Sequence, residues 1–164
     1  MNLENHQSIV LKELENSAEI DICARMMANS EPWITLRRGY EASVETLSVP
    51  SKEVYLALSD DEIVGFIILN MQGAFVGFIQ TVCVSPEWRG EGIGSKLLDF
   101  VEGRILSETP NVFICVSSFN RDAQRLYRRH GYEVVGELKD YIVSGHSETL
   151  LRKTISPLSE FTKK

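Results

Sequence analysis

A short loop with three closely spaced glycines constrains the fold of this chain more than any other feature. The loop follows an apolar segment that ends at Ser85, and a segment with helical periodicity comes after it. Gly90, Gly92 and Gly94 carry no Cβ, so the main chain can approach a ligand closely. Free N–H groups and the partial positive charge of a helix start would point to one place beside Arg89. The pattern predicts a strand, loop and helix that suit a pyrophosphate, although a glycine-rich turn without a ligand has the same composition.

The residue order in this loop differs from two common phosphate-binding loops. A Walker loop needs Gly-Lys followed by Ser or Thr, whereas Gly94 is followed by Ser95. The dinucleotide fingerprint G-x-G-x-x-G has a longer second spacing than the G-x-G-x-G found here. The pattern that fits is Arg-x-x-Gly-x-Gly, at Arg89, Gly92 and Gly94. It resembles the acyl-CoA pyrophosphate loop of the GNAT superfamily of N-acetyltransferases.

A second motif, Asn-x6-Tyr-x3-Gly-Tyr, follows at Asn120, Tyr127, Gly131 and Tyr132. Seven residues make two helical turns, so Asn120 and Tyr127 project from roughly the same side of a helix. Taken alone, Tyr127 is typical of a core tyrosine and Asn120 of a helix N-cap. Together with the glycine loop, they resemble the cofactor core of the GNAT superfamily over residues 75–133. The motif style is similar to that of ribosomal-protein alanine N-acetyltransferases.

The alternation of apolar segments predicts the order βααβββαβαββ and the class α/β (α+β). We expect one mixed central sheet of about seven strands with helices on both faces. The first helix is expected to begin near Asp21. The expected strands span residues 8–14, 53–58, 63–70, 75–84, 112–116, 132–138 and 148–152, and the expected helices span 20–28, 33–47, 94–106 and 120–130.

Length and composition predict a single domain over residues 1–155 with a peripheral tail, 156–164. The net charge of −6 argues against a nucleic-acid partner, whose binding surface is normally basic. The apolar segment at 63–69 is too short to cross a membrane as a helix. Three cysteines without metal-ligand spacing, and no evident signal peptide at Met1–His6, predict a cytoplasmic protein. A monomer and a homodimer both remain open.

The resemblance implies acetyl-CoA as cosubstrate and requires no metal. It implies that the strand edge at Val82, Cys83 and Val84 pairs with the pantetheine arm, and that Asn120 holds this arm or the adjacent backbone. Tyr127 would lie near the thioester sulfur and donate a proton to the departing thiolate. The pyrophosphate would bind the amides of the loop Arg89, Gly90, Glu91, Gly92, Ile93, Gly94 and Ser95.

An amine would attack the thioester carbonyl directly, and most of the rate would come from holding both reactants together. A backbone N–H at 82–84 would stabilise the oxyanion. The usual general base is missing, because Cys115 stands where ribosomal-protein alanine N-acetyltransferases have a glutamate. His146 and Glu148 are the candidates, although each also fits a solvated position. A water chain, or uptake of a neutral amine, would need no base.

The acceptor site is expected between the first two helices and the last hairpin. Glu31, Trp33 and Tyr141 are the candidate substrate-binding residues, although Trp33 also fits a core position. Arg37 and Arg38 suggest an acceptor with a carboxylate or phosphate, or simply a solvated helix face. The favoured function is acetyl transfer to a primary amine, with a peptide or protein α-amine slightly preferred. The alternatives are a small-molecule amine acetyltransferase and a CoA-binding module without catalysis.

Overall fold

The computed structural model describes residues 8–164. The segment Met1–His6, for which we predict no signal peptide, lies outside the described residues. The strands are β1 (Ile9–Glu13), β2 (Lys52–Ser59), β3 (Glu62–Asn70), β4 (Phe78–Val84), β5 (Asn111–Ser117), β6 (Glu133–Leu138) and β7 (Glu148–Thr154). The helices are α1 (Ser17–Ala28), α2 (Tyr40–Leu47), α3 (Ile93–Leu106) and α4 (Arg121–Arg129), with short 3-10 turns η1 (Pro86–Trp88) and η2 (Leu158–Glu160). The predicted order βααβββαβαββ is confirmed.

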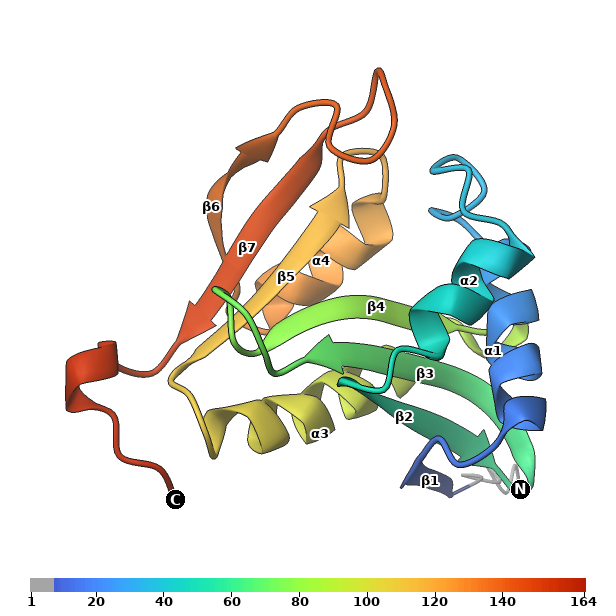
Figure 1. Ribbon diagram of the computed structural model, residues 1–164, viewed down its shortest axis with the longest axis horizontal. Coiled ribbons are helices and arrows are strands. Elements are labelled where there is room, and N and C mark those ends of the chain that lie inside the picture. Colours follow the sequence, from blue (N-terminus) through green and yellow to red (C-terminus); the bar gives the residue numbers. More distant parts are fainter. Residues whose placement is uncertain (1–7) are drawn as a thin grey trace, which may run out of the picture.

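All seven of these strands form one mixed sheet in the order β1-β2-β3-β4-β5-β7-β6. Every neighbouring pair is antiparallel except β4 and β5, which are parallel. Helices α1 and α2 lie over one face, and α3 and α4 lie over the other (Figure 1). The expected mixed sheet with helices on both faces is therefore present.

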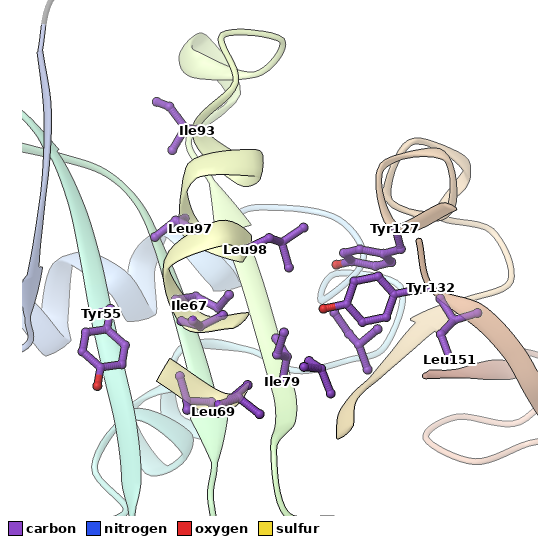
Figure 2. Close-up of a cluster of buried hydrophobic side chains, with 14 of the residues drawn as sticks. Tyr55, Ile67, Leu69, Ile79, Ile93, Leu97, Leu98, Tyr127, Tyr132 and Leu151 are labelled. Atoms are coloured by element: carbon purple, nitrogen blue, oxygen red, sulfur yellow. The ribbon is translucent and has the colours of Figure 1, made fainter. Parts of the chain in front are cut away.

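Strand β3 explains why this sheet is covered on both faces. Successive side chains of a strand point to opposite faces. Phe66 and Ile68 accordingly pack with α1 and α2, while Ile67 and Leu69 pack against α3 (Figure 2). All four side chains are fully buried. A strand buried on both sides reads as a continuous apolar run, as β3 does.

Strands β4 and β5 pair only at one end, and this opens the sheet. Their register joins Phe78 to Phe113 and Ile79 to Ile114 and goes no further. Directly after Ile79 the register of β4 against β3 shifts, leaving Gln80 as an extra residue. Such a bulge bends a strand and interrupts its pairing. Beyond this point the two strands diverge, as Figure 1 shows.

The predicted starts of β4 and α1 were wrong. Strand β4 begins at Phe78 rather than at residue 75, because Gly77 turns the chain with a φ of +86°. The Gly77 carbonyl accepts a hydrogen bond from Phe113 N–H at 2.9 Å. Helix α1 begins at Ser17, not near Asp21, because the Asn16 side chain caps the Glu19 N–H.

The predicted helix over 33–47 was also wrong, since only α2 is helical there. The Arg37 N–H bonds the Ile34 carbonyl at 3.1 Å, and the Arg38 N–H bonds the Trp33 carbonyl at 2.9 Å. With Arg37 at a φ of 55°, these are the two bonds of a Schellman motif, which here closes a hydrogen-bonded turn and not a helix. The chain then turns, and Gly39 is the N-cap of a separate helix.

The end of the chain returns to α3. Lys164 N–H donates to the Ser107 carbonyl at 3.2 Å, after the short turn η2. The division at residue 155 between a domain and a tail stays a prediction. No helix among residues 8–164 is long and apolar enough to span a membrane.

Candidate active site

Two cavities meet where β4 and β5 diverge. The larger cavity, of about 820 Å³, lies between the glycine loop and α4. The smaller cavity, of about 420 Å³, lies between β4 and β5 and is lined on its other sides by segments 32–38 and 141–142. The residues that line both cavities are Pro32, Trp33, Val82, Asn120 and Tyr127. A ligand in one cavity can therefore touch a ligand in the other.

The glycine loop provides the main-chain groups of the larger cavity. Gly90 and Gly92 have φ values of 81° and 80°, a conformation that side chains with a Cβ rarely adopt. Helix α3 starts directly after Gly92, with no side-chain cap and no acidic residue in its first turn. The first amides of a helix have no partner within it. The N–H groups of Ile93, Gly94 and Ser95 are thus free to bind an anion at this cavity.

Most of the predicted cofactor residues line the larger cavity, but Glu91 does not. Those that line it are Val82, Cys83, Val84, Arg89, Gly90, Gly92, Ile93, Gly94, Ser95, Asn120 and Tyr127. Sequence reasoning missed Trp88 and three arginines of α4, Arg121, Arg125 and Arg129. These arginines stand four residues apart, a spacing that places side chains on one helix face. That periodicity was the signal by which they could have been found.

The junction of β5 and α4 holds Asn120 between the two cavities. The Asn120 side-chain oxygen accepts a hydrogen bond from Ala123 N–H at 3.3 Å and so caps α4. The Gln124 amide donates to the Ser117 and Ser118 carbonyls at 3.1 and 3.0 Å. These bonds fix the start of the helix to the end of the strand.

Tyr127 projects from α4 to the place where the two cavities meet, and it is 5% exposed. Its ring meets the edge of Tyr132 at 6.0 Å (Figure 2). The Tyr132 hydroxyl donates to Glu102 at 2.9 Å, and Lys153 donates to the same carboxylate at 2.7 Å. Burial, and then the charge of Glu148, raise the pKa of Tyr127, which keeps its phenol protonated. Within residues 8–164 the Tyr127 hydroxyl has no hydrogen-bond partner, so it can donate to a ligand.

Glu148 is the buried carboxylate of the smaller cavity. It is 4% exposed, which excludes the alternative of a solvated strand edge. The β5–β7 register places it opposite Ser117, whose hydroxyl donates to Glu148 Oε1 at 2.5 Å. Burial raises the pKa of Glu148, and the Ser117 hydrogen bond partly opposes this shift. A carboxylate with a raised pKa is a better proton acceptor than an exposed one.

Cys115 and His146 contribute less to the smaller cavity. Cys115 lines it, but burial and the nearby Glu148 charge raise the pKa of the thiol to about 11. At neutral pH this cysteine is therefore a thiol and not a base. His146 lines neither cavity and instead packs edge-on against Phe119, with ring centroids 4.9 Å apart. The structure places Glu148, and not His146, in the smaller cavity, which Tyr127 also lines.

The three predicted acceptor residues divide between the cavities. Trp33 lines both, and Tyr141, 62% exposed, lines the smaller one. Glu31 lines only the larger cavity, and its carboxylate accepts hydrogen bonds from the Thr35 amide and hydroxyl at 3.2 and 2.9 Å. Arg38 also lines the smaller cavity, together with Gln80 from the β4 bulge.

Comparison with known proteins adds a family to this geometry. The family model described as "Acetyltransferase (GNAT) family" matches residues 18–132. The aminoalkylphosphonate N-acetyltransferase of Salmonella typhimurium is 34% identical over 123 residues, which cover 68% of this chain and 74% of that protein. The N-alpha-acetyltransferase RimI of Mycobacterium tuberculosis is 28% identical over 149 residues, covering 86% of each chain. Among solved structures, an aminoglycoside 6'-N-acetyltransferase complexed with coenzyme A has the same fold, with a TM-score of 0.71 at 18% identity over 90% of this chain and 98% of that one.

Proposed function

This chain belongs to the acetyltransferase (GNAT) family and is an acyltransferase, and we propose that it transfers an acetyl group from acetyl-CoA to a primary amine in a ternary complex. One observation carries the proposal: the larger and smaller cavities meet at Val82, Asn120 and Tyr127, and the buried Glu148 lines the smaller one. Acetyl-CoA occupies the larger cavity, and the amine occupies the smaller one. A solved structure of the same fold is a complex with coenzyme A, which supports the choice of donor.

The free amides at the start of α3 bind the pyrophosphate of the donor, and the α4 arginines add positive charge beside it. The unpaired edge of β4 hydrogen-bonds the pantetheine arm as a neighbouring strand would. This arrangement delivers the thioester to the junction at Val82. Because both reactants are held in contact, the attack becomes effectively unimolecular.

Glu148 takes one proton from the incoming ammonium and passes it to solvent. The neutral nitrogen then bonds to the thioester carbonyl carbon, and a main-chain N–H of 82–84 binds the oxyanion that forms. As the C–S bond breaks, Tyr127 gives its proton to the sulfur. The second proton lost by the nitrogen restores the phenol. The products are an N-acetyl amide and the CoA thiol.

A glutamate on β7 takes the role that the resemblance assigns to the β5 position of Cys115. Glu148 pairs in register with Ser117, two residues beyond Cys115 on the neighbouring strand. The charge of Glu148 raises the pKa of both Cys115 and Tyr127, which supports a common location for the three groups. The base therefore reaches the same space from a different strand.

Two acceptor classes fit this reaction. A peptide or protein α-amine is favoured by the closing segment before β7, where Tyr141 lines the smaller cavity, and by the likeness to an N-alpha-acetyltransferase. A small-molecule amine is favoured by the volume of about 420 Å³ and by the likeness to an aminoalkylphosphonate N-acetyltransferase. Action in the cytoplasm, and a monomeric or homodimeric state, stay predictions.

The proposal is tested by measuring CoA thiol release from acetyl-CoA with a panel of peptides and small amines. We expect release that depends on the amine, with mass spectrometry identifying an N-acetyl product. Exchange of Glu148 for Gln should abolish most of this release while acetyl-CoA still binds by calorimetry. Binding of acetyl-CoA without turnover of any amine would contradict the proposal.

A further inference from the structure

The wall of the smaller cavity carries two charged side chains of opposite sign. Glu148 comes from β7, and Arg38 comes from the turn before α2. The other lining side chains are apolar or neutral, including Thr46 and Gln80. No ion pair joins Arg38 to Glu148 or to any other residue in the described part of the chain.

Arg38 is exposed and differs from two other arginines of this protein, whose guanidinium groups pair with carboxylates. Arg104 bridges Glu53 and Glu108, with N–O distances of 2.6 Å to each. Arg25 bonds Asp21 at 2.9 Å. Arg38 has no such carboxylate within residues 8–164, although its guanidinium has five donors. These donors are available to a ligand of the smaller cavity.

The backbone holds Arg38 in this place. The Arg38 N–H closes the Schellman motif by donating to the Trp33 carbonyl. Its neighbour Arg37 adopts the left-handed conformation that lets the chain turn there, at a φ of 55°. Arg37 lines neither cavity. The turn therefore assigns the two adjacent arginines to different surroundings.

A second cation adds to the positive charge on this side. Lys52 begins β2, and its pKa is lowered first by burial and then by the charge of Arg38. Lys52 lines neither cavity, but its positive charge adds to that of Arg38 and so favours an anion beside Arg38. Neutral hydrogen-bonding side chains, Thr46 and Gln80, line the same cavity as Arg38.

We propose that the acceptor is a small amine that also carries an anionic group, which Arg38 binds while the amine faces Glu148. This inference rests on the proposed function and names its substrate class. A molecule with a positive amine and a negative group at its other end matches the two charges of the cavity. A carboxylate and a phosphonate or phosphate share this chemistry, because the guanidinium fork binds each of them in a bidentate manner.

The test compares matched acceptors with the full chain. The acceptors are aminoalkylphosphonates, ω-amino carboxylates, plain alkylamines and alkyldiamines, each with two to four methylene groups, together with a short peptide with a free N-terminus. We expect kcat/KM for the anionic acceptors to exceed that of the plain amines by about tenfold to 100-fold, the worth of a charge-assisted hydrogen bond. The ranking of carboxylates against phosphonates identifies the anion.

Substitution separates Arg38 from its neighbour. Arg38→Gln should remove most of this preference by raising KM for the anionic acceptors. Their kcat, and kcat/KM for the plain amines, should change little. Arg38→Lys should restore part of the preference. Arg37→Gln is the matched control and should keep the wild-type ranking, because Arg37 lines neither cavity.

Calorimetry of each anionic acceptor of the panel on the enzyme–CoA complex gives a readout that does not need turnover. Binding that is lost in Arg38→Gln would support the anion site even if acetyl transfer failed, and that failure would count against the proposed function alone. Turnover with equal kcat/KM for anionic and plain amines would overturn the anion site. A preference for diamines or peptides that survives Arg38→Gln would overturn it as well.

Discussion

The two cavities of this protein are built in different ways. The larger cavity is formed mainly by two stretches, 82–95 and 119–129, and much of its binding capacity lies in main-chain N–H groups. The smaller cavity draws side chains from both sides of the sheet opening, including Arg38, Tyr141 and Glu148. Main-chain binding tolerates many side chains but demands glycine at particular turns. Side-chain binding depends on a few residues, and we expect these to decide which acceptor is used.

The proposed difference between the two cavities is tested most strongly by Glu148→Gln. We expect kcat to fall about 100-fold to 10,000-fold, the usual contribution of a general base, with little change in acetyl-CoA binding. Gln keeps the shape and can still accept the Ser117 hydrogen bond. Glu133→Gln, an exposed change on the neighbouring strand β6, is the control and should keep wild-type kcat. Equal kcat for Glu148→Gln and wild type would show that Glu148 takes no part in the reaction.

The same variant makes a pH prediction. Burial raises the pKa of Glu148 above its ordinary value of 4.5, so the unfolded chain loses this proton at lower pH than the folded one. The stability of the wild type therefore falls relative to Glu148→Gln as pH rises from 4.5 through the raised pKa, and then the difference stays constant. Thermal melts of both proteins across this range measure the difference. The acid limb of the wild-type kcat profile should likewise lie above pH 4.5 and be absent in the residual rate of the variant.

A substitution at Gly77, next to the paired ends of β4 and β5, should change stability and not catalysis. A Cβ at Gly77 would lie 2.6 Å from the Asn111 carbonyl oxygen and 2.6 Å from Ile105, at a φ of +86°. Gly77→Ala should therefore lower the free energy of unfolding by about 3 kcal/mol or more, since strain and overpacking add. Urea unfolding measures this change. Gly90→Ala is the matched control, because its φ is also positive but its Cβ would meet no atom within 4 Å. Equal losses for the two variants would contradict packing as the cause at Gly77.

Tyr127→Phe tests the junction between the cavities. We expect kcat to fall about 100-fold, the lower end of the usual range for a general acid, while KM for acetyl-CoA changes little. The buried ring remains, so its packing against Tyr132 should persist. Rates measured with thioesters of more acidic thiols should narrow the gap, because a better leaving group needs less protonation. A gap that does not change with the leaving group would argue against the acid role.

Arg37→Gly gives the smallest expected effect. Arg37 holds a left-handed conformation that glycine adopts without strain, so the variant should gain about 0.5–1 kcal/mol of unfolding free energy. Thermal denaturation measures the gain. Since Arg38 keeps its place, the acceptor ranking should not change. A loss of stability would contradict this expectation. It would mean that contacts of the Arg37 side chain stabilise the fold by more than the left-handed conformation destabilises it.

The sequence predicts the larger cavity much better than the smaller one. The glycine spacing and the Asn120–Tyr127 pair are local patterns, and the order of elements follows from apolar periodicity. The wrong helix over 33–47 shows where local patterns fail, because the left-handed turn at Arg37 uses a residue that does not favour it. Glu148 and Arg38 come together only through the fold, and no spacing in the sequence relates them. The sequence offers both His146 and Glu148 as candidate bases, and in the fold Glu148 is buried in the smaller cavity whereas His146 packs against Phe119.

The most direct measurement is a crystal structure of the protein with coenzyme A and an unreacted amine acceptor. The account predicts the pyrophosphate on the amides of 92–95, the sulfur within hydrogen-bonding reach of the Tyr127 hydroxyl, and the amine beside Glu148. Coenzyme A bound elsewhere, or an amine that approaches the sulfur from a side without Glu148, would contradict it.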